Sequence, residues 1–103
     1  MPGDPIVYDE PPLSAFGLPD RVDPYAGVPD TVVHDVFRDT AGFLIAECAR
    51  LALLATSEPE RERWRARSIE VLDQRRYVAA DDRAELRRHI ERWQAEIDEL
   101  RER

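Results

Sequence analysis

The chain has 103 residues and a formal net charge of −7. This length allows one small domain with a thin core, because a chain of this size buries only about 60–65% of the surface that its unfolded form exposes. The acidic balance disfavours nucleic acid as a partner, since phosphates repel it. The single cysteine, Cys48, cannot form an internal disulfide, so we expect a cytoplasmic protein that needs no oxidising compartment.

Residues 1–29 differ in composition from the rest of the chain. They hold seven of the eight prolines, and because proline removes a backbone donor and breaks helices, we predict an extended N-terminal arm. The arm also carries apolar side chains that a solvated linker would lack, among them Tyr8, Phe16 and Tyr25. Two interpretations stay open: a floppy leader, or an arm that lies against its own helices or another chain.

Residues 30–103 are almost free of proline and predict an all-α domain of three helices. The first is a long central helix over residues 30–56, with Asp30 or Thr31 as its N-cap. Apolar residues recur along it every three or four positions, which predicts the face that is buried in the core. This stripe consists of Val33, Phe37, Ala41, Leu44, Cys48, Leu51 and Ala55.

The second predicted helix spans residues 58–77 and forms one half of a helical hairpin. Ser57 and Glu60 have the spacing of a capping box, in which each side chain accepts from the other residue's backbone N–H, and proline is tolerated in the first turn. The inward stripe predicted for this helix is narrow: Trp64, Ser68, Ile69, Val71 and Leu72.

The third predicted helix spans residues 82–102, with Asp81 or Asp82 as its cap. If Asp82 is the cap, Glu85 completes another capping box. Its apolar residues repeat with the 3.5-residue period of a coiled-coil seam over about two heptads. The seam comprises Leu86, Ile90, Trp93, Ile97 and Leu100. The flanking charges predict i,i+4 pairs on a solvated face: Arg87 with Glu91, Arg92 with Glu96, and Glu99 with Arg103.

The run from Gly42 to Ala55 is the most apolar stretch of the chain. Only Glu47 and Arg50 interrupt it, and we predict that they form an i,i+3 ion pair. The run is shorter than the roughly 20 apolar residues that a membrane span requires, so we expect no insertion into a bilayer.

The helix over residues 30–56 carries more apolar surface than two narrow helices can cover. A second apolar line flanks the main stripe, and a line of small residues could admit another helix backbone. The arm, a second copy of the chain or a different protein could close over this surface. We predict these partner-binding residues: Tyr8, Phe16, Tyr25, Val36, Gly42, Phe43, Ala46, Ala49, Arg50, Leu53, Leu54, Trp64 and Trp93.

No motif in the chain is specific for catalysis or for a cofactor, and we expect neither a cofactor nor a bound metal. Cys48 lies on the buried stripe, which favours a core residue over a nucleophile. His89 is predicted on the surface side of the third helix. The arginines around Trp64 spread around their helix and are neutralised by nearby glutamates, which favours a protein interface over nucleic acid.

The sequence therefore predicts a small non-catalytic protein that acts by stoichiometric binding to another protein, such as a bacterial antitoxin, an immunity-type neutraliser or an accessory subunit. The alternative is a self-assembling homodimeric helical bundle with a structural role. A second alternative is a metal-dependent all-α nucleotide pyrophosphohydrolase that would hold Mg²⁺ through Glu47, Glu70 and Asp73.

Overall fold

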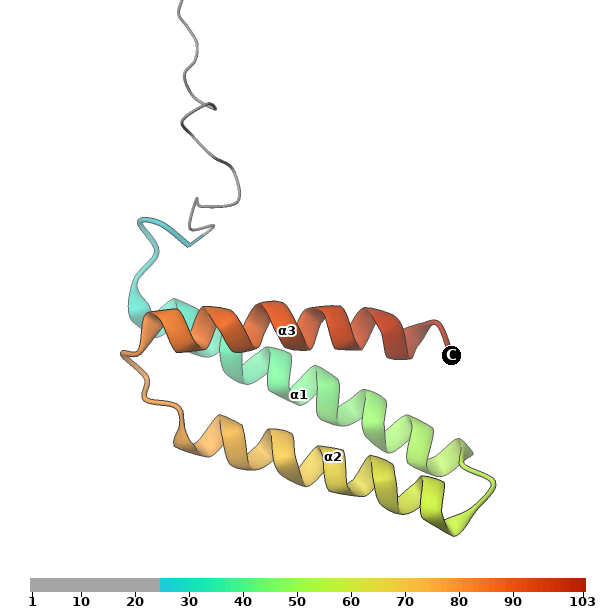
Figure 1. Cartoon of the computed structure of the whole chain (residues 1–103). Coiled ribbons are helices and arrows are strands. Elements are labelled where there is room, and N and C mark those ends of the chain that lie inside the picture. The colour runs from blue at the N-terminus through green and yellow to red at the C-terminus, as the bar shows by residue number, and fades with distance from the viewer. Residues whose placement is uncertain (1–24) are drawn as a thin grey trace, which may run out of the picture.

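The computed structural model describes residues 25–103, which form three α-helices joined by short turns (Figure 1). Helix α1 spans Asp30–Leu54, α2 spans Glu58–Tyr77 and α3 spans Arg83–Arg101. The predicted all-α fold is confirmed, and each predicted helix end lies within two residues of the observed one. Most of the predicted arm, including Tyr8 and Phe16, lies outside the described residues.

The predicted N-caps of α2 and α3 are confirmed. The Ser57 hydroxyl accepts a hydrogen bond from the backbone N–H of Glu60 at 3.3 Å, and the Asp82 carboxylate accepts one from the backbone N–H of Glu85 at 3.2 Å. Each bond satisfies a backbone donor that the first turn of a helix otherwise leaves without a partner.

The predicted cap of α1 is wrong, because Asp30 is already the first helical residue. Pro29 occupies the N-cap position and provides no side-chain bond. The Asp30 carboxylate instead accepts a hydrogen bond from Arg83, at the start of α3, at 2.8 Å. Arg83 also donates to the carbonyl oxygens of Val28, at 2.8 Å, and of Tyr25. One arginine thus ties the turn before α1 to α3.

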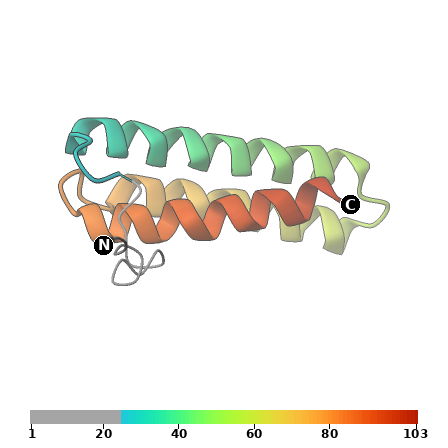
Figure 2. The same cartoon turned by 90° about the horizontal axis from the view of Figure 1, so that it is seen from above.

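Helix α1 packs against both of the other helices. Figures 1 and 2 show α2 and α3 running in opposite directions on the same side of α1, with their axes diverging toward the C-terminal end of α1. The predicted pair formed by Arg92 and Glu96 is replaced by a contact between helices. The Arg67 guanidinium on α2 donates two hydrogen bonds to the Glu96 carboxylate on α3.

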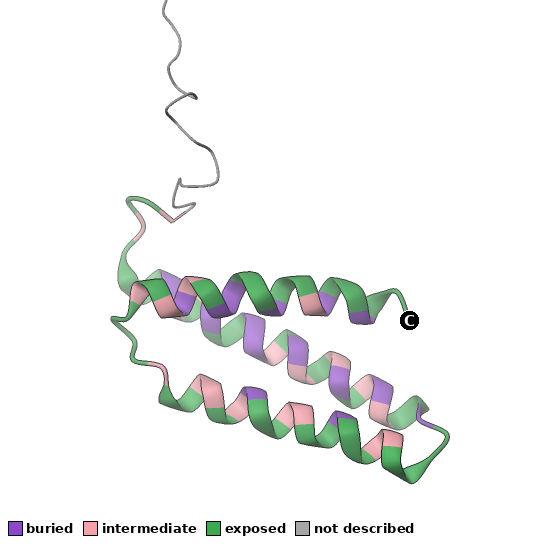
Figure 3. Cartoon of the chain, in the orientation of Figure 1, coloured by how far each residue is buried: buried purple, intermediate pink, exposed green. Residues whose placement is uncertain are grey.

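The core consists of one apolar face from each helix, with α1 contributing the longest. All seven residues of the predicted α1 stripe are buried, and so is the whole predicted α3 seam. Of the stripe predicted for α2, only Trp64 and Val71 are buried, and Ile69 is 61% exposed. Figure 3 shows the difference, since the buried segments run along α1 whereas α2 is mostly exposed or half-buried.

His89 is buried, contrary to the prediction that it lies on the surface. It is only 8% exposed and packs among aromatic rings, with ring centroids 4.9 Å from Trp93 and 5.9 Å from Phe37. The reason is its position three residues after Leu86 and four before Trp93, which places it beside the seam on the side that faces α1.

Candidate interaction surface

The second half of α1 presents an exposed apolar surface on the side away from the core. We call it the outer face and define it by seven residues that are exposed or half-buried: Gly42, Phe43, Ala46, Ala49, Arg50, Leu53 and Leu54. Leu53 is 86% exposed, Leu54 64% and Phe43 58%. In the first half of α1 the corresponding side is polar, with exposed Asp35, Arg38 and Asp39. Exposed apolar surface is therefore concentrated in the second half of the helix, and Val32, 45% exposed, is the large apolar side chain that the first half exposes.

The charged groups at the outer face are neutralised within the chain. The predicted pair of Glu47 and Arg50 is present: Arg50 donates from Nε to the Glu47 carboxylate at 3.0 Å. Arg50 also donates from Nη2 to the carbonyl oxygen of Leu100 at 3.1 Å. Glu47 accepts a further hydrogen bond from Arg101 at 3.4 Å. The hydrogen bond from Arg50 lowers the pKa of the Glu47 carboxyl, although partial burial opposes it. These contacts hold Arg50 against the C-terminal end of α3.

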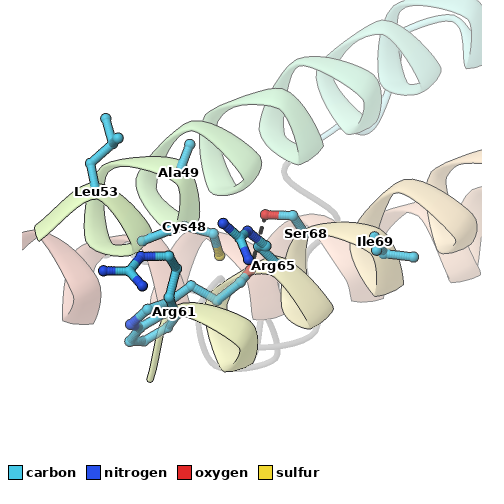
Figure 4. Close-up of a pocket in the computed structure, with 9 residues that line it drawn as sticks. Cys48, Ala49, Leu53, Arg61, Arg65, Ser68 and Ile69 are labelled. Atoms are coloured by element: carbon cyan, nitrogen blue, oxygen red, sulfur yellow. Dashed lines mark hydrogen bonds between the residues drawn. The ribbon is translucent and has the colours of Figure 1, made fainter. Parts of the chain in front are cut away.

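A groove of about 660 Å³ adjoins the outer face between α1 and α2. Figure 4 shows Ala49 and Leu53 projecting from α1 away from α2, whereas Cys48 points between the two helices. Ile69 stands exposed on the α2 wall. Arg65, on the same wall, pairs with Glu62 at 2.8 Å. The groove thus extends the apolar surface from α1 onto α2 without adding an unpaired charge.

Cys48 is fully buried, in agreement with the prediction that it belongs to the core. Burial raises the pKa of its thiol, which keeps the sulfur protonated and unreactive near neutral pH.

Both tryptophans that the sequence placed at the partner surface lie in the core of the chain itself. Trp93 is completely buried between α1 and α3, with its ring stacked on Phe37 at a centroid distance of 5.2 Å. Trp64 is buried too, and the guanidinium groups of Arg63 and Arg103 lie over its ring at 4.8 and 5.4 Å. Because Trp93 belongs to α3 and faces α1, a partner could reach it only by separating α3 from α1.

The other predicted partner residues lie at different places. Val36 and Tyr25 are half-buried and pack against the core near the start of α1, apart from the outer face. Ile69 was not among the predicted partner residues, although helical geometry provides the signal. At about 100° per residue, position 69 lies roughly 140° around the helix from Trp64.

The carboxylates proposed for the hydrolase alternative do not converge. Glu47 is paired with arginines of α1 and α3, whereas Glu70 and Asp73 lie exposed on α2, with Glu70 bonded to Arg67 at 2.6 Å. Within residues 25–103 no three His, Cys, Asp or Glu side chains are grouped so that they could hold a metal ion.

No helix in residues 25–103 combines the length and the apolarity needed to cross a membrane. Comparisons of the chain with protein families, with curated proteins and with solved structures find no match.

Proposed function

We propose that this chain is a small non-catalytic interaction protein that acts by stoichiometric binding through the outer face of α1. One observation carries the proposal: Phe43, Leu53 and Leu54 each expose more than half of their surface on one face, whose charged member Arg50 is paired with Glu47. Apolar patches beyond a few hundred Å² are uncommon on soluble monomers and usually mark interaction sites. An antitoxin, an immunity-type neutraliser or an accessory subunit would each use such a surface.

Burying the exposed apolar side chains of the outer face against a partner is energetically favourable. Removing apolar surface from water contributes roughly 25 cal/mol per Å², so burying one Leu side chain is worth about 1.5–3 kcal/mol. Leu51 is buried and contributes this stabilisation to the domain. Leu53 and Leu54 remain exposed to water and do not contribute it unless a partner covers them. A contiguous group of large exposed apolar side chains is therefore better explained by a partner that covers it than by the stability of the isolated domain.

The matched substitutions Leu53→Asp and Tyr77→Asp test the proposal. Tyr77 is 77% exposed at the end of α2, away from the outer face, so both changes remove a similarly exposed apolar side chain. We expect Leu53→Asp to weaken binding to whatever macromolecule the chain holds, whether a different protein or a second copy. Binding should survive Tyr77→Asp, with a fixed stoichiometry measured by light scattering.

Equal binding by the two variants would contradict the proposal, because the outer face would then have no role. Helix content, measured by circular dichroism, should remain the same in both variants.

A further inference from the structure

The outer face of α1 is size-complementary to itself in an antiparallel arrangement. Four of its residues lie in one line along the helix: Gly42, Ala46, Ala49 and Leu53. When a second α1 runs in the opposite direction with the symmetry axis between positions 47 and 48, Gly42 faces Leu53 of the second copy, and Ala46 faces Ala49 of the second copy. Leu53, the largest of the four side chains, then faces Gly42, which has no side chain, and the two-fold axis repeats this contact.

Gly42 lacks a steric reason within the described chain. A Cβ added there would meet nothing within 4 Å, and the residue has an ordinary helical conformation. Glycine inside a helix costs about 1 kcal/mol relative to alanine. A close approach by another helix explains the glycine, because helix axes come within about 8 Å of one another only where the facing side chains are small.

The register also matches the division of α1 into a polar and an apolar half. Pairing about position 47.5 overlaps the two helices from about residue 41 to Leu54, which is the apolar half. The exposed Asp35 and Asp39 fall beyond the end of the second α1. A parallel arrangement would instead place Leu53 against Leu53 and Gly42 against Gly42. The two leucines would hold the helices apart, and a gap would be left between the two glycines. It would also align the helix dipoles unfavourably.

The available area meets the requirement of a modest dimer. Phe43, Leu53, Leu54 and Ile69 each expose between 58% and 86% of their surface, which amounts to roughly 500 Å² per copy for side chains of this size. If all of this surface entered the interface, two copies would bury about 1,000 Å², the lower bound for a specific interface. A two-fold interface uses the same patch on both subunits, as this pattern allows.

We propose that the occupant of the outer face is a second copy of this chain, bound by an antiparallel, two-fold pairing of α1 with Gly42 against Leu53. This inference rests on the proposed function of the outer face and names its partner. The groove beside Ile69 adjoins this pairing, because Ala49 and Leu53 of the outer face also line it.

Sedimentation equilibrium of the purified full chain tests the inference, with variants that change the size of the facing residues. We expect the unmodified chain to be a dimer. Gly42→Leu should raise the dimer dissociation constant by about 30-fold or more, because both symmetric contacts become overpacked. Helix content should not fall, since leucine is the better helix former and its Cβ meets no atom within 4 Å in the monomer.

The double variant Gly42→Leu with Leu53→Ala exchanges the large and small residues and should restore the dimer. Ala95→Leu, which adds similar bulk on the exposed side of α3, should leave it unchanged. A monomer at every concentration would overturn the inference, and the proposed function would then survive only if Leu53→Asp still abolished binding to a different protein. A dimer that Gly42→Leu does not weaken would overturn it too.

Discussion

The Arg67 guanidinium and the Glu96 carboxylate meet in a two-bond pair that joins α2 to α3. Arg67 donates from Nε to Oε2 at 2.9 Å and from Nη2 to Oε1 at 2.7 Å. Both side chains are about one quarter exposed, and the hydrogen bonds that Arg67 donates to Glu96 raise the pKa of the guanidinium further above its already high value. A paired geometry of this kind is stronger than a single charged hydrogen bond. It bridges two helices that otherwise meet through their packing on α1.

We expect Arg67→Ala to lower the free energy of unfolding by about 1–2 kcal/mol, because it leaves the Glu96 carboxylate partly buried without its cation. Arg65→Ala, which removes an exposed pair within α2, should cost no more than about 0.5 kcal/mol. Urea denaturation measures both values. Equal losses in the two variants would show that the pair between α2 and α3 contributes no more than an exposed pair.

The pH dependence of stability should carry a contribution from His89. Burial lowers the pKa of its imidazole from the usual 6.5, while the Glu85 carboxylate, 3.3 Å from Nε2, partly opposes this. As the pH falls through about 6.5, the unfolded chain therefore takes up the proton first, and this stabilises the unfolded state. The stability present above about pH 6.5 is lost progressively as the pH falls toward the lower pKa of the folded chain.

His89→Gln should remove this loss, so the urea midpoints of the variant at about pH 5.5 and pH 7.5 should differ less than those of the unmodified chain. The same pH dependence in both proteins would contradict the assignment to His89. A separate loss at lower pH, where carboxylates such as Glu47 take up protons, should remain in both.

Two alanines five residues apart on α1 should respond in opposite ways to enlargement. Ala41 is fully buried in the core, so Ala41→Leu should overpack it and cost about 1–3 kcal/mol. Ala46 is exposed on the outer face, so Ala46→Leu should change the stability of the monomer by less than about 0.5 kcal/mol. Thermal unfolding at low protein concentration, where association contributes little, measures the difference. A comparable loss in both variants would mean that Ala46 is internal.

The turn before α1 should loosen when its contact with α3 is removed. Arg83 holds Tyr25, Val28 and Asp30 through hydrogen bonds, and the Val28 amide donates to the Tyr25 carbonyl at 2.9 Å. In Arg83→Ala we expect the Val28 amide to exchange with deuterium about tenfold faster or more. The matched variant Arg88→Ala removes an exposed arginine that pairs with Glu85. It should leave this amide unchanged, and equal acceleration in both variants would contradict the role of Arg83.

Local signals in the sequence determined the helices well, whereas contacts between helices could not be predicted. The caps at Ser57 and Asp82 depend on residues three apart, which any helix start brings together. Glu96 illustrates the limit. Arg92 lies at i,i+4 spacing from Glu96 in the sequence, but the carboxylate pairs with Arg67, 29 positions away. Arg67 is the stronger partner because it supplies two hydrogen bonds in a less exposed place.

The outer face was predictable in part. Rotation by about 100° per residue places Gly42, Ala46 and Ala49 on one line away from the core stripe, and the structure places them there. Trp64 was assigned to a partner because tryptophan and arginine are frequent at binding hot spots, and Trp93 because it lies on the predicted coiled-coil seam. A small domain with a thin core needs large apolar side chains too. The sequence does not show whether a given tryptophan serves the chain's own core or a partner interface.

Disulfide trapping between two copies tests the antiparallel pairing of α1 most directly. With Cys48 replaced by alanine, Gly42→Cys and Leu53→Cys chains are mixed and oxidised. We predict that a covalent dimer forms in the mixture and hardly at all with either chain alone, because each position lies about 16 Å from its own symmetry mate in this register, beyond the roughly 7 Å that a disulfide can bridge. Cross-linking of Leu53→Cys chains with one another, or none in the mixture, would contradict the antiparallel dimer.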